Sequence, residues 1–241
     1  MTVLNTIVAD QLIKFRKEVE EVLEKGVKKE LAIMEVLKRY VKESKNIRFE
    51  GNGYSDEWVE EAARRGLSNL KTTPEALAVY ARPESIELFT KHGIYSKEEM
   101  HARHEIELEN YVKKIQIESR VIGDMAINHI VSTSLKYQTQ LVENVKGQKE
   151  IGIDPQYFAP TIEMIKKISE YTSSIVRLQN EMTEARKEAN NIEDLEGRAV
   201  LYSTKVKNYF EEIRYSVDKL ELIIDDDEWP LPKYRELLLI K

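Results

Sequence analysis

Hydrophobic residues in the first 45 positions recur at steps of three or four, the spacing of one face of an α-helix. A first series ends before Gly26, and a second runs from residue 28 to about residue 45. The apolar positions are Leu4, Ile7, Val8, Leu12, Phe15, Val19, Val22 and Leu23, and then Leu31, Met34, Leu37 and Val41. We therefore expect residues 1–45 to form a helical hairpin with an apolar face on each helix.

Turn-forming residues divide the region from 46 to 95 into short pieces. The sequence Gly-Asn-Gly at residues 51–53 interrupts the helical pattern and allows positive φ. Ser55 can cap a helix that ends at Gly66, and Thr-Pro at residues 73–74 combines a capping hydroxyl with a proline at the first helical position. This region should contain several short helices.

The longest helical pattern starts at Ser96. Glu99 follows three residues later, and this capping-box spacing marks the N-terminus of a helix. Within the pattern, only Gly123 breaks the periodicity, and Gly147 closes it. We expect one long helix here.

Two further long helices follow, each with a nearly heptad apolar stripe. Their positions are Ile162, Ile165, Ile168, Ile175, Leu178, Met182, Ala185 and Ala189, and then Leu195, Ala199, Tyr202, Val206, Tyr209, Ile213, Leu220 and Ile223. We expect these helices to pair antiparallel around the stripes.

Beyond them, four acidic residues, Trp229 and two prolines predict an extended tail. Such a tail has little reason to be ordered unless the indole docks. Trp229 should therefore pack on the helical body, with Leu231 and Tyr234 joining the contact and with the region of residues 54–77 taking part.

The pattern as a whole predicts an all-α fold. We expect an elongated bundle of three long helices, an N-terminal hairpin and several short helices. A single helical domain should cover residues 1–241, with sub-regions at 1–45, 46–95 and 96–241.

Composition narrows the class of protein. With no cysteine among 241 residues, disulfides and thiolate metal sites are excluded, and a reducing, cytoplasmic location is expected. The N-terminus lacks a signal-peptide pattern, and no apolar run approaches the length of a bilayer span, so no membrane partner is expected. The net charge of -6 disfavours nucleic acid as a partner.

One pair of residues has the spacing of a metal site. Glu98 and His101 match the Glu-x-x-His spacing of di-iron bundles, but such a site needs a second copy and two further glutamates. His101 and His104 do not follow the order of zinc proteases. The pattern favours solvated side chains in a first helical turn, and we expect no metal here.

Three other groups also favour structural roles. Residues 51–53 lack the remainder of a phosphate-binding glycine loop. His129 and the hydroxyls of residues 132–134 point to different faces of a helix. Asp225, Asp226 and Asp227 lack the alternating ligands of a calcium loop. From the residues alone we expect no catalytic, cofactor-binding or metal-binding site.

Several stretches resemble the C-terminal region of type III glutamine synthetases. They are TVLNTIVA at residues 2–9, GNGYSDEW at 51–58, EAARRGL at 61–67, NLKTTPEAL at 69–77, ELENY at 107–111 and WPLPKYRE at 229–236. The run from 51 to 77 is the most specific. Val59 and Ser132-Thr133 depart from the family pattern.

The resemblance implies an ATP-dependent glutamate–ammonia ligase as the parent polypeptide, working in a cytoplasmic homo-oligomer. The family's residues for ATP and for Mg or Mn lie in a catalytic barrel that this chain lacks, so the chain alone should be inactive. Its partners would be that barrel and neighbouring subunits. The alternatives are a free-standing helical interaction or scaffold protein and, less well supported, a helical metalloenzyme using Glu98 and His101.

Overall fold

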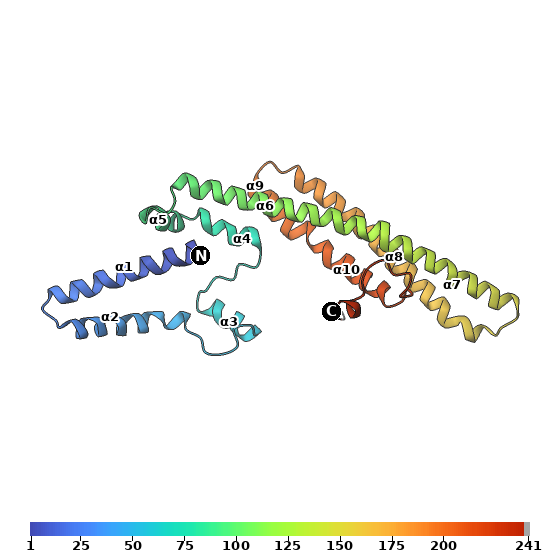
Figure 1. Ribbon diagram of the computed structural model, residues 1–241, viewed down its shortest axis with the longest axis horizontal. Helices are drawn as coiled ribbons and strands as arrows, with labels where there is room; N and C mark the ends of the chain where they lie inside the picture. The colour runs from blue at the N-terminus through green and yellow to red at the C-terminus, as the bar shows by residue number, and fades with distance from the viewer. Residues whose placement is uncertain (239–241) are drawn as a thin grey trace. The chain divides into compact units, whose positions relative to one another are not determined.

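Helices provide all the regular secondary structure of residues 1–238, the part of the chain that this computed structural model describes (Figure 1). This confirms the all-α prediction. Contacts divide the chain into two compact units, Met1–Ile106 and Glu107–Lys241. The division falls inside a helix, whereas the sub-regions expected from the sequence divide at residue 95. No helix among the described residues is both long and apolar enough to cross a membrane.

The first unit contains a hairpin, several short helices and the start of a long helix. Its elements are α1 (Thr2–Glu24), α2 (Lys29–Glu43), the 3₁₀ turn η1 (Ser44–Ile47), α3 (Asp56–Arg64), α4 (Thr73–Leu77), the 3₁₀ turn η2 (Ala78–Ala81), α5 (Pro83–Lys91) and the first part of α6 (Lys97–Asp124). The predicted hairpin is confirmed. Gly26 turns the chain with a φ of +81°.

The hairpin is closed by a different face of α2 from the one expected. Ala32 and Val36 are buried against Val19 of α1, and the rings of Phe15 and Tyr40 meet edge to face at 5.6 Å. The expected residues are exposed instead, namely Leu31, Met34, Leu37 and Val41. The covered face carries Ala32 and Val36, whose side chains are smaller than the leucine and methionine side chains of the exposed face.

Most of the predicted helix N-termini are confirmed, but one capping residue and the backbone of residues 51–53 differ from the prediction. Ser55 caps α3, and Ser96 and Glu99 form the expected capping box. Before α4, however, the capping hydroxyl belongs to Thr72 rather than Thr73, because Thr72 pairs reciprocally with Glu75. The glycines of residues 51–53 do not adopt positive φ.

The long helix continues further than its glycines suggested. α6, the π-helical segment η3 (Met125–Val131) and α7 (Ser132–Glu150) follow without a break. Gly123 is buried against Gln179 of α8 instead of interrupting the helix. Gly147 lies inside α7, and the helix ends just before Gly152, which has a φ of +79°.

The second unit is built around α8 (Pro155–Asn190). Short connections at 151–154 and 191–194 reverse the chain, so that α8 runs antiparallel to α7 before it and to the helices after it (Figure 1). Those later elements are α9 (Leu195–Leu201), the π-helical segment η4 (Tyr202–Val206), α10 (Asn208–Glu221) and α11 (Tyr234–Leu237).

Both predicted stripes form the core of this unit, which confirms the antiparallel pairing. The residues that are at most 3% exposed include Ile168, Ile175, Leu178, Met182, Ala185, Ala189, Ala199, Tyr202, Val206, Ile213 and Leu220. At one end of the core, the Tyr202 hydroxyl donates to Asn190 Oδ1 at 2.8 Å. Burial raises the pKa of Tyr202 above its ordinary value.

Candidate interaction surface

The apolar stripe of α1 extends beyond the part that α2 covers. Phe15 and Val19 face α2, whereas Leu4, Val8 and Leu12, on the same side of the helix, are exposed. Leu12 keeps 62% of its surface accessible. Half of a strongly apolar helix face therefore has no cover within the described residues.

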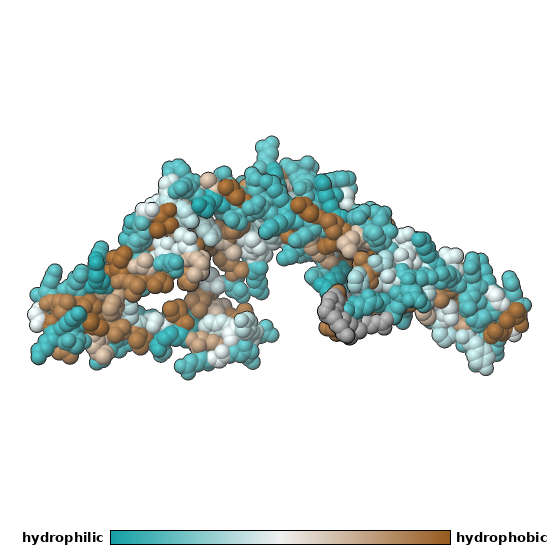
Figure 2. Space-filling view, in the orientation of Figure 1, coloured by the Kyte–Doolittle hydropathy of each residue, from teal (hydrophilic) through white to brown (hydrophobic). Residues whose placement is uncertain are grey.

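The outer face of α2 adds a second exposed apolar row. Leu31 is 62% exposed, and Met34, Leu37 and Val41 continue the row along the helix. Hydrophobic side chains gather over both α1 and α2 in Figure 2. Together with the exposed part of α1, this row forms what we call the hairpin face: Leu4, Val8, Leu12, Leu31, Met34, Leu37 and Val41. Exposed apolar patches are characteristic of interaction sites.

A charged cluster fixes α1 against α5. The Asp10 side chain, only 9% exposed, lies 2.8 Å from Lys14 Nζ, 2.7 Å from Lys91 Nζ and 2.8 Å from His92 Nε2. Hydrogen bonds from Lys14, Lys91 and His92 lower the pKa of Asp10 well below its ordinary range. The cluster holds the exposed half of α1 in a defined place within the first unit.

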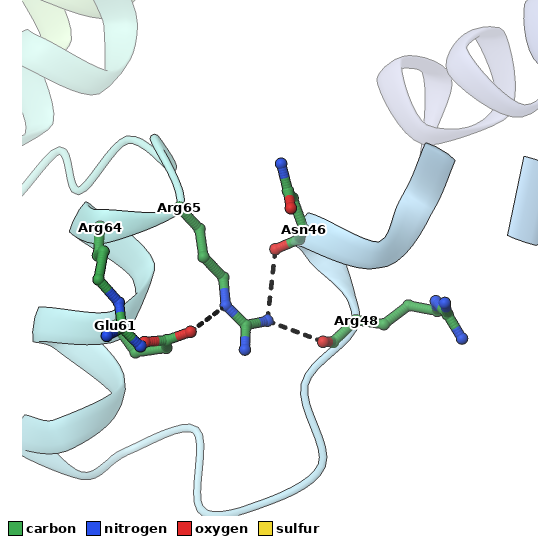
Figure 3. A network of polar contacts seen from close by, with 5 residues as sticks. All are labelled: Asn46, Arg48, Glu61, Arg64 and Arg65. Atoms are coloured by element: carbon green, nitrogen blue, oxygen red, sulfur yellow. Dashed lines mark hydrogen bonds and ion pairs between the residues drawn. The ribbon is translucent and has the colours of Figure 1, made fainter. Parts of the chain in front are cut away.

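Arg65 joins α3 to the segment after α2 (Figure 3). Its guanidinium donates to the backbone carbonyl of Arg48 at 2.8 Å and to that of Asn46 at 3.4 Å, while Glu61 accepts from Nε. Arg64 pairs with the other carboxylate oxygen of Glu61. One cationic side chain thus binds a carbonyl of η1 and the carbonyl of the residue that follows η1.

Aromatic stacking completes the same junction. The rings of Phe49 and Trp58 stack with centroids 4.1 Å apart, and the Arg65 guanidinium lies 5.5 Å from the Trp58 ring. A Cβ at Gly51 would come within 2.7 Å of Phe49 Cζ, so any side chain at this position would displace the Phe49 ring. Tyr54, at the end of this ordered loop, is fully exposed.

The tail of the second unit is docked. Trp229 is 7% exposed and, with Leu231, lines a pocket formed with η3 and α10. This confirms the predicted packing of Trp229 and Leu231 on the helical body. The involvement of residues 54–77, which belong to the other unit, stays a prediction. The side chain of Tyr234 lies outside the described residues.

Lys233 attaches the tail to the end of α10. Its ammonium donates to the backbone carbonyls of Glu221 at 2.9 Å and Ile224 at 3.2 Å, and it pairs with the Asp226 carboxylate. The last carbonyls of a helix lack partners within the helix and carry partial negative charge, so a cation is favourable there.

The residues that the sequence pattern singled out for possible chemistry occupy structural positions, beginning with the acidic run. Asp226 binds Lys233, and Asp225 accepts from the backbone N–H groups of Asp227 and Trp229 in a turn. Glu98 and His101 are exposed in the first turns of α6. Among the described residues, no group of three or more metal-binding side chains comes together.

The hydroxyl and glycine candidates are likewise part of the scaffold. Ser134 is buried and donates to the carbonyl of Ile130, whereas His129 is exposed. At residues 51–53, Asn52 Oδ1 accepts from the N–H of Tyr54, which makes a turn. The geometry brings none of these residues into a reactive constellation with another.

Three important residues were not singled out from the sequence. Two of the three partners of Asp10 are 81 and 82 positions away, and Arg65 and Lys233 bind backbone carbonyls. The one visible indication of the Asp10 cluster was that Asp10 is the only charged residue before Lys14 in the sequence. Arg65 and Lys233 bind backbone carbonyls, which every residue has, so no partner side chain in the sequence indicates these contacts.

Comparison with known proteins agrees with these observations. The chain is 46% identical over its full length to a glutamine synthetase of Bacteroides fragilis, of which it covers 34%. It is 34% identical over 86% of its length to a glutamine synthetase of Butyrivibrio fibrisolvens and 29% identical over 99% to the type-3 glutamine synthetase of Dictyostelium discoideum, covering 29% and 33% of them. The chain thus spans about a third of the length of these relatives.

The described residues form an all-α protein whose N-terminal hairpin exposes apolar side chains. Residues 32–149 match the family described as the glutamine synthetase C-terminal domain. The chain therefore carries a glutamine synthetase C-terminal domain, as the resemblance of its sequence implied.

Proposed function

We propose that this chain is the helical C-terminal domain of a type III glutamine synthetase and that its hairpin face binds the catalytic part of the enzyme. The parent reaction would be the ATP-dependent ligation of ammonia to L-glutamate in a cytoplasmic homo-oligomer. ATP and Mg or Mn would be held by the catalytic barrel. The role of this domain would be structural, at contacts with the barrel and with neighbouring subunits.

The observation that carries the proposal is the hairpin face. A row of leucine, methionine and valine side chains on two well-packed helices costs free energy while it faces water, at roughly 25 cal/mol for each Å² of apolar surface. The curated relatives are about three times longer than this chain, so they contain the additional residues that could cover such a face. The exposed Tyr54 loop belongs to the same unit and would extend the contact.

Binding can be tested with the remaining two thirds of the Bacteroides fragilis enzyme, produced as a separate polypeptide. Sedimentation of this part with the present chain should reveal a complex. A chain with Leu12→Asp and Leu31→Asp should not bind. If the doubly substituted chain bound as well as the unchanged chain, the hairpin face would not be the contact surface.

The domain alone should neither hydrolyse ATP nor form glutamine. Stabilising an acyl-phosphate pathway requires metals and cationic groups placed at the reacting atoms, and the described residues bring together no group of three or more metal-binding side chains. A coupled assay for ADP release and a direct assay for glutamine check this expectation. Glutamine formation by the purified chain would contradict it.

A further inference from the structure

The second unit contains a pocket that the proposed function does not use. It has a volume of about 450 Å³ and lies between η3, α10 and the tail. Its lining is largely apolar and includes Met125, Ala126, Ile130, Val217 and Trp229. Pockets of a few hundred Å³ with this kind of lining are typical of sites for small molecules.

The charged residues at the pocket lie in a row along α10. Glu211, Asp218 and Glu221 contribute three carboxylates, and Arg214 contributes one guanidinium. Arg214 Nε lies 3.6 Å from Asp218 Oδ2, and the three carboxylates outnumber the single guanidinium. The pocket therefore has an excess of negative charge, which favours a positively charged ligand.

Two further features coincide at this place. Three lining residues, Met125, Ala126 and Ile130, belong to the π-helical segment η3, and π-helical turns occur frequently at functional sites. Trp229 forms one wall, and its indole Nε1 is buried with no hydrogen-bond partner among the described residues. This N–H can only donate, so it would pair with an acceptor atom of a ligand and not with its ammonium group.

We propose that this pocket binds a compact organic cation, an ammonium group on an apolar body. The apolar body would lie against Met125, Ile130 and Val217. The ammonium would be placed near Glu211 and Glu221. The pocket lies in the second unit and shares no residue with the hairpin face, so its binding can be tested without a catalytic barrel.

The test uses the 241-residue chain and three probes of similar shape: benzylamine, benzyl alcohol and benzoate. Methionine methyl groups labelled with ¹³C report the location by NMR, with Met125 assigned through Met125→Leu. A probe of this size should bind with a dissociation constant of about 1 mM. Benzylamine should shift the Met125 signal saturably, and benzoate should bind at least about tenfold more weakly, a difference of about 1.4 kcal/mol.

Two variants separate charge from shape. Glu211→Gln with Glu221→Gln should weaken benzylamine about fivefold or more and leave benzyl alcohol unchanged, whereas Glu143→Gln on α7, outside the pocket, should change neither. Val217→Phe should fill the pocket and abolish binding of both probes. An unshifted Met125 signal at about 10 mM benzylamine, or equal affinity for benzoate, would overturn the proposal.

Discussion

At the junctions between helices, several side chains make contacts that cannot be predicted from the residues next to them in the sequence. Ser55, Ser96 and Glu99 were recognisable because capping depends on residues three positions apart. Two of the three partners of Asp10 could not be identified, since Lys91 and His92 lie at the C-terminal end of α5, far along the chain. Local chemistry is thus readable from sequence, and long-range pairing is not.

The Asp10 cluster predicts a specific pH dependence of stability. Because the folded state lowers the pKa of Asp10, its contribution is present above the unfolded value of about 3.9 and is lost as the pH falls below it. Asp10→Asn should therefore destabilise the protein at pH 7, and the difference from the unchanged protein should shrink towards pH 3. Denaturant unfolding at the two pH values measures this. Glu20→Gln, at an exposed ion pair, is the control and should have little effect.

Gly51 and Gly53 make a matched pair at the Arg65 junction. Gly51→Ala should destabilise by about 1–3 kcal/mol, because the new methyl group meets a Phe49 ring that is held by its stacking on Trp58. Gly53→Ala should be nearly neutral, since nothing lies within 4 Å of its Cβ position. Thermal unfolding compares the two. Equal losses would mean that backbone freedom, not space, makes glycine necessary at position 51.

At the scale of helices, a periodic pattern shows that a helix exists more reliably than it shows which face is covered. The stripes of α8 and of the helices after it became core, as expected, because each helix there has one dominant apolar face. On α2, two apolar arcs compete. The arc with Ala32 and Val36 packs on α1, and the arc with Met34 and Val41 remains exposed.

The packing of the long helices predicts how much a charged side chain in their core would lower the stability of the protein. Val206 is completely buried, so Val206→Glu should cost about 3 kcal/mol or more, since a carboxylate there has neither water nor a partner. Val200→Glu is the control, because Val200 is 45% exposed on the preceding helix. Unfolding in urea should show a large loss for the first variant and almost none for the second. A tolerated charge at Val206 would contradict the packing of the stripe.

The tail predicts a stability effect of its own. Trp229→Ala should destabilise the second unit by about 3–5 kcal/mol, the usual cost of truncating a buried tryptophan. The turn before it is also tied to α7, where Gln140 Nε2 donates to Glu228 Oε1 at 2.6 Å. Thermal unfolding checks the prediction, with Trp58→Phe as an aromatic control that keeps most of its buried area. An unchanged melting temperature for Trp229→Ala would show that the tail contributes nothing to the fold.

For the whole molecule, the sequence predicted the fold class and the family. The all-α class followed from the periodic apolar pattern, and the family followed from runs such as residues 51–77. The hairpin face could not be predicted, because the sequence predicted its apolar residues without showing that they stay uncovered. The hairpin face is exposed because α2 packs on α1 through the opposite side, which carries Ala32 and Val36.

The most direct measurement of the central proposal uses residues of equal exposure. Leu12 on the hairpin face and Ile117 on α6 are both 62% exposed. Each is changed to Asp in a chimera in which this chain replaces the matching third of the Bacteroides fragilis enzyme, and glutamine formation and assembly are measured. The account predicts that Leu12→Asp abolishes assembly and activity, while Ile117→Asp retains both and the isolated domains melt at the same temperature. Full activity and assembly of the Leu12→Asp chimera would contradict it.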